Sequence, residues 1–303
     1  MAFDAFALIL CMLALGMLFA RLRVLPQDSA QTLNGVVLYV CLPAAVLTYV
    51  PRLTLDASLV GLMLTPWLLM LATWALVSLA TRVFGFARDV HAVLLIGVSL
   101  ANSSFIGYPM TRALLGDDAL PYAVVYDQFG TFLLLSTFGL FVLARYSGER
   151  PPGALQVLGR VVRFPPLWAL LVAVLVMPEQ PPAWIATALQ QLADAMLPLV
   201  MLAVGLSIQL RLPREERVPL ATGLALKLVL LPALAIPLSW MLGLQGTMLR
   251  VNVLESAMPT MITAAALAIS HRLAPRLAAA LVGYGIVLSL LTLPLWAVVV
   301  SRL

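Results

Sequence analysis

The chain has 303 residues, of which 63% are hydrophobic and only 10% are charged. A soluble domain carries roughly 25% charged residues, so this composition excludes a water-soluble fold. The formal net charge of +5 comes from arginines scattered through short segments, which excludes the dense basic patch of a nucleic-acid-binding protein.

Apolar runs long enough to cross a bilayer recur along the whole sequence, since a helix needs about 20 apolar residues to span the hydrocarbon core. The first run lacks the basic start and the small-residue cleavage site of a signal peptide, so it is interpreted as a retained span. We expect ten spanning helices, at residues 3–20, 31–50, 58–81, 91–115, 120–144, 154–177, 184–208, 218–242, 249–270 and 277–301. The pattern predicts an all-α membrane protein.

Arginines are distributed unevenly over the segments that join these runs. Lys and Arg accumulate on the cytoplasmic side, and an outward N-terminus would place 13 arginines inside and four outside. The inner set is Arg21, Arg23, Arg82, Arg88, Arg145, Arg150, Arg160, Arg163, Arg211, Arg214, Arg217, Arg272 and Arg276. The outer set is Arg52, Arg112, Arg250 and Arg302. We therefore expect both termini to face outward.

Prolines recur at a nearly constant offset between the two halves of the chain. Pro43 and Pro198 lie within apolar runs 155 residues apart, and Pro109 and Pro259 lie 150 residues apart. This spacing predicts two five-helix repeats, the second inverted because five is odd, as in many secondary transporters. Proline is common in membrane helices, so a chance match is the alternative. The expected repeats are residues 1–146 and 154–303.

Two of the runs contain residues that interrupt a helix. Proline clashes with the preceding turn and glycine loosens it, so a break is predicted near Gly107, with Pro109 opening a second half-helix. Pro259 predicts a break in the run 249–270. Freed backbone groups at membrane depth must face protein or water, and a half-helix N-terminus attracts anions. Two anion-attracting breaks near the midplane are therefore expected.

Polar residues flank both expected breaks and are candidates to bind a solute. The candidates are Asn102, Ser103, Gly107, Tyr108, Pro109, Pro259, Thr260 and Thr263, with Ser104 as a further donor. Ser, Thr and Asn also pack membrane helices through hydrogen bonds, so helix packing is the alternative interpretation of these side chains.

Four ionisable residues lie inside the runs, where a charge costs roughly 2.5–3.5 kcal/mol at a helix centre and usually has a function. Asp127 and Glu255 are candidates to carry a coupling proton, and Lys227 to neutralise one of them. The alternatives are a fixed ion pair for Lys227, contact with water for Asp127 and helix capping for Asp194. Metal-ligand spacing and catalytic motifs are absent from the sequence, so no metal, cofactor or enzyme activity is expected.

The ordered motifs resemble the auxin efflux carrier family, which includes bacterial permeases. The segment Asn102–Pro109, followed by Leu-Gly-Asp-Asp, is similar to the fourth-span signature of that family. Leu254–Thr260 and Leu288–Trp296 are similar to its ninth and tenth spans. Leu42-Pro43 and Pro198–Gly205 are similar to its second and seventh spans.

This resemblance implies ten helices in two inverted repeats, with interrupted helices 4 and 9 crossing. It implies a scaffold domain from spans 1, 2, 6 and 7, a transport domain from spans 3–5 and 8–10, and elevator-like carriage of small organic anions such as mono- or dicarboxylates. Asn102, Pro109 and Pro259 match crossover residues of the family. Thr263 stands where many relatives have Asn, a departure that bears on substrate preference.

Other functions stay open at this point. A sodium-coupled organic-anion symporter of the bile-acid type shares the general architecture, and a sodium requirement would favour it. A non-transporting membrane sensor would need an output domain, for which the spans leave no room. The expected location is the bacterial inner membrane, the expected partners are a small organic anion and the bilayer, and a homodimer is left open.

Overall fold

The computed structural model describes residues 2–26, 28–53, 58–148, 153–207 and 214–303, and the regular elements in these ranges are all helical. The chain forms two compact units. Unit 1 comprises Met1–Leu55, Ser104–Val124 and Val162–Ile208. Unit 2 comprises Asp56–Ser103, Val125–Val161 and Gln209–Leu303. The predicted all-α class is confirmed.

Six helical stretches of the described residues are long and apolar enough to cross a membrane. They are Ser29–Tyr49, Leu59–Phe84, Asp117–Ser147, Ala183–Ser207, Arg214–Met241 and Pro275–Val300. Ala7–Leu22, the described apolar part of the first helix, and Pro165–Leu175 add two shorter apolar stretches. Hydropathy predicts ten spans; fewer form one long helix because three of the predicted runs are interrupted. One interruption lies at Phe164, which is extended (φ −80°, ψ 113°) because a proline follows it.

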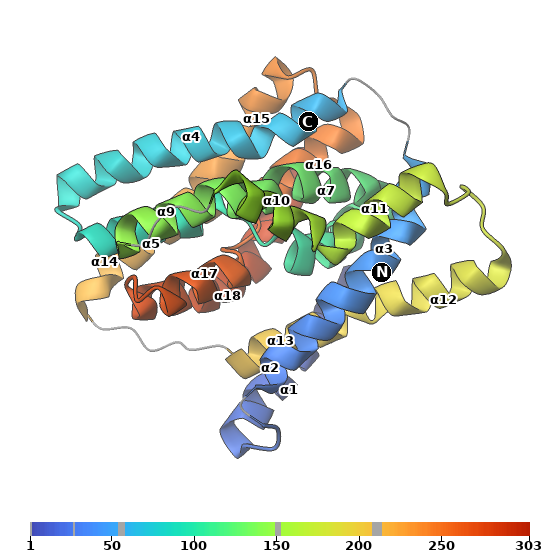
Figure 1. Cartoon of the computed structure of the whole chain (residues 1–303), viewed down its shortest axis with the longest axis horizontal. Coiled ribbons are helices and arrows are strands. Elements are labelled where there is room, and N and C mark those ends of the chain that lie inside the picture. Colours follow the sequence, from blue (N-terminus) through green and yellow to red (C-terminus); the bar gives the residue numbers. More distant parts are fainter. Residues whose placement is uncertain (1, 27, 54–57, 149–152, 208–213) are drawn as a thin grey trace. The chain divides into compact units, whose positions relative to one another are not determined.

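Unit 1 contains a close helix crossing between its first and last helices. Its helices are α1 (Ala2–Leu22), α2 (Ser29–Val36), α3 (Leu42–Tyr49), α6 (Tyr108–Leu115), α11 (Pro165–Leu175), α12 (Ala183–Asp194) and α13 (Met196–Ser207). α1 and α13 lie side by side (Figure 1). A Cβ atom on Gly16 would lie 2.4 Å from the carbonyl oxygen of Leu202, and one on Gly205 2.4 Å from that of Leu13. Small residues let membrane helices approach closely, so these glycines allow α1 to pack directly on α13.

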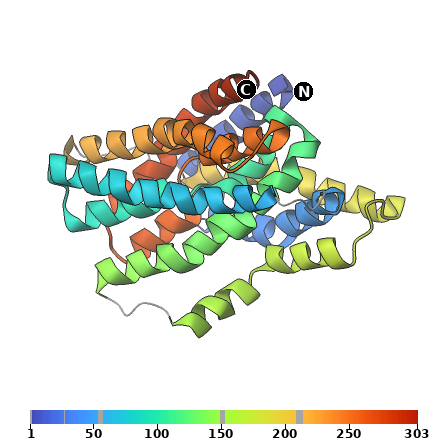
Figure 2. The ribbon, with the colours of Figure 1, turned by 90° about the horizontal axis from the view of Figure 1, so that it is seen from above.

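Unit 2 contains most of the remaining helices. They are α4 (Leu59–Phe84), α5 (Arg88–Ser99), α8 (Phe132–Leu134), α9 (Leu140–Ser147), nearly all of α10 (Ala154–Val162), α14 (Arg217–Ala225), α15 (Leu231–Met241), α16 (Gly246–Ser256), α17 (Ile262–Ser270) and α18 (Pro275–Val300). α7 (Leu120–Tyr126) contains the point where the chain passes from unit 1 to unit 2. Figure 2 shows α4, in cyan, as one long unbroken helix.

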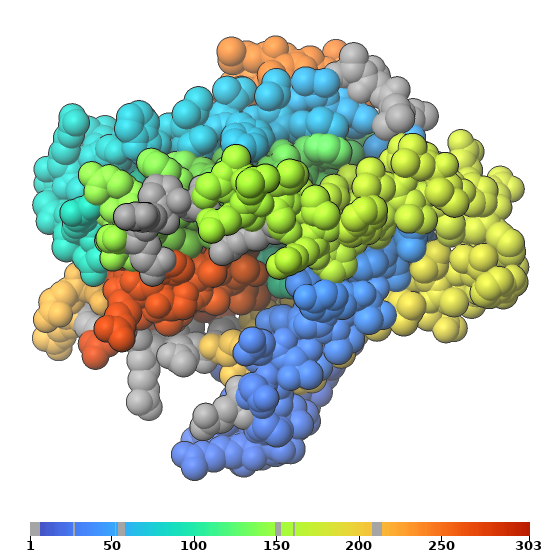
Figure 3. Space-filling model, in the orientation of Figure 1, coloured from blue at the N-terminus to red at the C-terminus, as the bar shows by residue number. Residues whose placement is uncertain are grey.

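One side of α4 carries large apolar side chains that are exposed. They are Val60, Leu64, Leu68, Leu71, Trp74, Leu79 and Val83. In Figure 3, α4 covers a wide part of the visible surface. An exposed apolar stripe marks contact with a membrane or another protein, and a helix of this length and apolar character fits the bilayer core.

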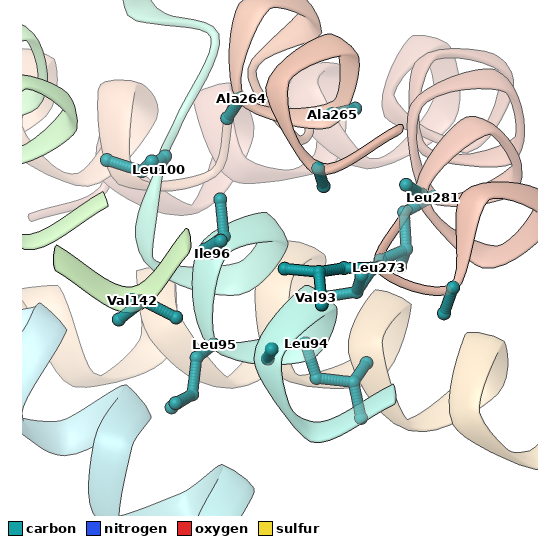
Figure 4. Packing of buried hydrophobic residues seen from close by; sticks show 14 of the residues in the cluster. Val93, Leu94, Leu95, Ile96, Leu100, Val142, Ala264, Ala265, Leu273 and Leu281 are labelled. Atoms are coloured by element: carbon teal, nitrogen blue, oxygen red, sulfur yellow. The ribbon is translucent and has the colours of Figure 1, made fainter. Parts of the chain in front are cut away.

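The core of unit 2 forms around α5. Every residue from Ala92 to Ser99 is buried, as expected for a helix that is apolar on all sides. Figure 4 shows Val93 and Ile96 packed among side chains such as Leu273 and Leu281. α5 is therefore held rigidly up to its C-terminal end, where the first interruption begins.

Three prolines are each preceded by a widened helical turn with π geometry. The turns are Val37–Cys41, Ser103–Gly107 and Leu226–Leu230, and the prolines are Pro43, Pro109 and Pro232. A proline ring clashes with the carbonyl group four residues earlier, and that residue is the middle of each turn. The chain thus accommodates these prolines by widening a turn rather than by ending the helix.

Indole groups bind the carbonyl oxygens at two widened turns of unit 2. Pro232 has no N–H to donate to the carbonyl of Leu228, and the Nε1 of Trp296 donates to that oxygen at 2.8 Å. In the widened turn Asp127–Thr131, the Nε1 of Trp67 donates to the carbonyl oxygen of Phe129 at 3.1 Å. Membrane proteins satisfy displaced backbone groups internally, and these tryptophans do so here.

Candidate functional site

The first interruption lies between α5 and α6, earlier in the chain than predicted. α5 ends at Ser99, and Leu100 is extended (φ −97°, ψ 106°). The helix resumes at Ser103 with a widened turn. Gly107 is helical (φ −59°, ψ −54°), so the prediction of a break near Gly107 is wrong. The widened turn absorbs the clash from Pro109, which lies in the first turn of α6.

The second interruption lies where it is predicted, around Pro259. α16 ends at Ser256 and α17 begins at Ile262. The residues between them contain no helical turn of their own. This break in the run 249–270 is confirmed.

The two interrupted segments pair with each other inside unit 2. Ala101 and Thr260 form an isolated antiparallel bridge. The backbone N–H of Asn102 donates to the carbonyl oxygen of Pro259 at 2.8 Å. The backbone N–H of Met261 donates to the carbonyl oxygen of Leu100 at 2.9 Å. These amides therefore bind carbonyl groups of the opposing segment. The crossing therefore satisfies backbone groups that neither helix could satisfy alone.

Side chains reinforce this crossing. The hydroxyl of Thr260 donates to the carbonyl oxygen of Gly97 at 2.8 Å. Gly97 lies in the last turn of α5, so this bond ties the second interruption to the end of that helix. Asn102 is only 1% exposed, and its Nδ2 has no hydrogen-bond partner among the described residues. Most buried polar groups in proteins have a partner, so an unpaired amide nitrogen at the crossing calls for a physical explanation.

A buried polar cluster adjoins the crossing. The hydroxyl of Ser103 donates to Oδ1 of Asp127 at 2.6 Å, and Nε2 of Gln128 donates to Oδ2 at 3.0 Å. Tyr126 and Ser256 share a hydrogen bond of 3.1 Å. The predicted candidates Asn102, Ser103, Thr260 and Asp127 are therefore brought together within one unit.

Asp127, Lys227 and Glu255 are the fully buried charged side chains among the described residues, and all three lie in unit 2. Glu255 lies near enough to Lys227 for their charges to attract. Asp127 and Glu255 both act electrostatically on Tyr126. With all three ionised, two carboxylates and one ammonium leave one surplus negative charge. Asp127 binds Ser103 and Glu255 lies in the last turn of α16, so both carboxylates adjoin the crossing. Asp127 is fully buried and does not contact water at the surface.

Thr263 does not join this cluster. Its side chain is exposed on α17, whereas Thr260 is 2% exposed. Among the described residues, no side-chain hydrogen bond joins Thr263 to the polar groups of the crossing.

Unit 1 contains a separate cavity of about 650 Å³ that Tyr108 and Pro109 line. Tyr49 and Arg112 also line it. Most of the other lining residues are apolar: Leu8, Ala45, Ala113, Leu120, Ala193, Met196 and Leu197. Ligand sites are commonly apolar cavities of 300–1,000 Å³ with a few polar groups, so this cavity is a second candidate site.

Arg112 is the centre of a polar network in this cavity. Its Nε donates to Oδ1 of Asp117 at 2.7 Å, and its Nη1 is paired with Asp194. Its guanidinium carbon lies 5.8 Å from the centroid of the Tyr49 ring. Nε2 of Gln190 donates to the Tyr49 hydroxyl at 2.8 Å and to Asp194 at 2.9 Å.

Sequence reasoning missed the role of Arg112 in this network. Arg112 lies inside the predicted run 91–115, three residues after Pro109, yet it is counted above with the outer segments. An arginine next to a predicted helix interruption was the available signal. Asp194 is expected to cap or hydrate its helix, and the structure shows it paired across the cavity wall instead.

Comparison with known proteins agrees with these features. A family model described as membrane transport protein matches residues 1–152 and 153–297. An uncharacterized transporter of Methanothermobacter thermautotrophicus is 33% identical over 295 residues, which cover 96% of each chain. The uncharacterized transporter YfdV of Escherichia coli is 25% identical over 311 residues, covering 99% of this chain and 97% of that one. The chain therefore belongs to the membrane transport protein family, the auxin efflux carrier family that its motifs resemble, and is a multi-pass membrane protein.

Proposed function

We propose that this protein is a secondary transporter of small organic anions, with mono- or dicarboxylates as solutes. The observation that carries this proposal is the buried, unpaired Nδ2 of Asn102 at the crossing of the interrupted helices. A buried donor without a partner costs about 1–3 kcal/mol. A carboxylate oxygen of a bound solute would be an acceptor for it.

Helix ends at the crossing support an anionic solute. The chain resumes helical structure at Ser103 and again at Ile262, directly after the two paired segments. The N-terminus of a helix carries a partial positive charge and unpaired N–H groups. The crossing in unit 2 and the cavity lined by Tyr108 and Pro109 in unit 1 are the two places where solute contacts are proposed.

The surplus negative charge of the buried cluster supports proton coupling. Asp127 and Glu255 are both buried in unit 2 with the single cation Lys227, and ionisable groups inside a span are costly and usually functional. Binding of one proton to Asp127 or Glu255 would make the net charge of these three residues zero. Solute movement would then depend on whether that proton is bound. A sodium ion would neutralise the same charge, so sodium coupling is the alternative.

The architecture proposed for this function has ten spans in two inverted repeats. Six long helices, two shorter apolar helices and two interrupted runs supply the required number of segments. Unit 1 holds segments of spans 1, 2, 6 and 7, and unit 2 holds most of the others, which supports a scaffold and an elevator-like transport domain. An inner-membrane location with both termini outside is part of this proposal.

Uptake into proteoliposomes tests the function. The full chain would be reconstituted and given a panel of labelled mono- and dicarboxylates under imposed pH, sodium or voltage gradients. We expect uptake of a carboxylate that rises with an imposed proton gradient or potential and needs no sodium. A strict sodium requirement would favour the symporter alternative. If folded protein takes up no carboxylate under any gradient, the proposed function is wrong.

A further inference from the structure

We infer that Arg112 binds the carboxylate of the transported solute, and that Asp194 occupies this position on the guanidinium until the solute displaces it. The inference rests on the proposed function and names the recognition residue within the cavity of unit 1. It is carried by the polar network of Arg112, Asp194 and Gln190 on the wall of an otherwise apolar cavity.

The guanidinium is accessible and retains donors. The side chain of Arg112 is 34% exposed and that of Asp194 is 48% exposed. Arginine has five N–H donors in a planar fork that matches a carboxylate. The two aspartates are bound through Nε and Nη1, so a solute carboxylate can be bound along the Nη edge when Asp194 leaves. An ion pair this exposed contributes little, so it can be exchanged at low cost.

Asp194 is better placed for displacement than Asp117. Asp117 follows Arg112 by five residues and lies in the turn directly after α6, so it accompanies the arginine. Asp194 comes from the end of α12, 82 residues away. It also accepts a hydrogen bond from Gln190 at 2.9 Å. Gln190 would keep the displaced carboxylate hydrogen-bonded, so the exchange leaves no polar group without a partner.

The rest of the cavity suits a small organic acid. The Tyr49 ring lies beside the guanidinium, and Tyr108, Pro109, Met196 and Leu197 complete the lining with largely apolar groups. One cation in an apolar cavity recognises one carboxylate and leaves the remainder of the solute to apolar contacts. The fixed negative charge of Asp117 and Asp194 would disfavour anions held away from the guanidinium.

Substitutions of Arg112 and of Asp194 should change KM in opposite directions, and this contrast tests the inference. Uptake of labelled pyruvate, a small acid with one carboxylate, would be measured for the wild type, R112Q, R112K, D194N and D118N in proteoliposomes. We expect R112Q to raise KM at least about tenfold, since a charge-assisted hydrogen bond is lost. R112K should fall between R112Q and the wild type, because lysine lacks the planar fork. D194N should lower KM about twofold to fivefold, because the internal competitor loses its charge.

Asp118 provides the matched control. It lies next to Asp117 in the same turn. Among the described residues, Arg112 forms ion pairs with Asp117 and Asp194 and none with Asp118. D118N removes the same charge, and its KM should stay within about twofold of the wild type. Thermal stability of each variant in detergent shows whether the variant is folded.

The outcomes separate this inference from the proposed function. If R112Q and D194N both weaken uptake, or if folded R112Q and R112K keep the wild-type KM, the ion pair is only structural and the inference is wrong. If the wild type takes up neither pyruvate nor any other carboxylate of the panel, the proposed function fails and this inference falls with it.

Discussion

Replacing Asn102 by alanine should reduce solute uptake by about tenfold to a hundredfold without lowering the stability of the folded protein. The Nδ2 of Asn102 has no protein partner among the described residues, so its removal breaks no hydrogen bond of unit 2. A buried donor that pairs only with bound solute contributes to solute binding, at about 1–3 kcal/mol. The backbone pairing to Pro259 uses the main-chain N–H and survives the substitution.

A second buried asparagine in unit 2 provides the control for this prediction. The Nδ2 of Asn252 donates to the hydroxyl of Ser239 at 2.8 Å. N252A should therefore lower the thermal stability measured in detergent, whereas N102A should leave it unchanged or raise it. If N102A is destabilised as much as N252A and keeps wild-type uptake, Asn102 packs helices and does not bind solute.

Replacing Lys227 by methionine should nearly abolish folded protein, and adding E255Q should restore it. The single variant removes the buried cation whose charge attracts that of Glu255, and removing one partner of buried opposite charges costs about 3–5 kcal/mol. The double variant removes one charge of each sign, so the balance of the cluster returns to that of the wild type. Yield of monodisperse protein and unfolding temperature measure both effects.

The same variants separate a structural ion pair from ion coupling. E255Q alone should fold, because it removes the surplus negative charge of the cluster. Its uptake should no longer respond to an imposed pH gradient. Full proton dependence in E255Q would contradict the coupling role of Glu255. A stable K227M single variant would show that Lys227 does not compensate the buried carboxylates.

Much of the fold follows from composition and residue pattern. The apolar runs predict a helical membrane protein, and Pro259 marks the second interruption correctly. The charged residues at positions 127, 227 and 255 could be singled out because ionisable groups inside apolar runs are expensive. Each of these predictions depends on a local property of the chain.

The features that sequence reasoning misplaced depend on tertiary contacts. The first interruption lies at Leu100–Asn102, because this segment pairs with the backbone around Pro259, and no local signal fixes that register. Pro109 leaves its helix continuous because the preceding turn widens. Arg112 is counted with the outer segments because one of the carboxylates that hold it, Asp194, lies 82 residues away in the sequence.

Cross-linking of the two interrupted helices tests the crossing most directly. Ala101 and Thr260 are opposed in an antiparallel bridge flanked by the Asn102–Pro259 and Leu100–Met261 hydrogen bonds. Residues in such a pair have Cα atoms about 4.5 Å apart, within the range that a disulfide bridges. Cysteines at positions 101 and 260 would be introduced after Cys11 and Cys41 are replaced by alanine.

We predict that a membrane-permeable oxidant rapidly cross-links the 101–260 cysteine pair in native membranes. A control pair at positions 101 and 263 should stay reduced, because Thr263 lies on the exposed side of α17. Equal cross-linking of both pairs, or a 101–260 pair that stays reduced in folded protein, would contradict the crossing on which the transport site is built.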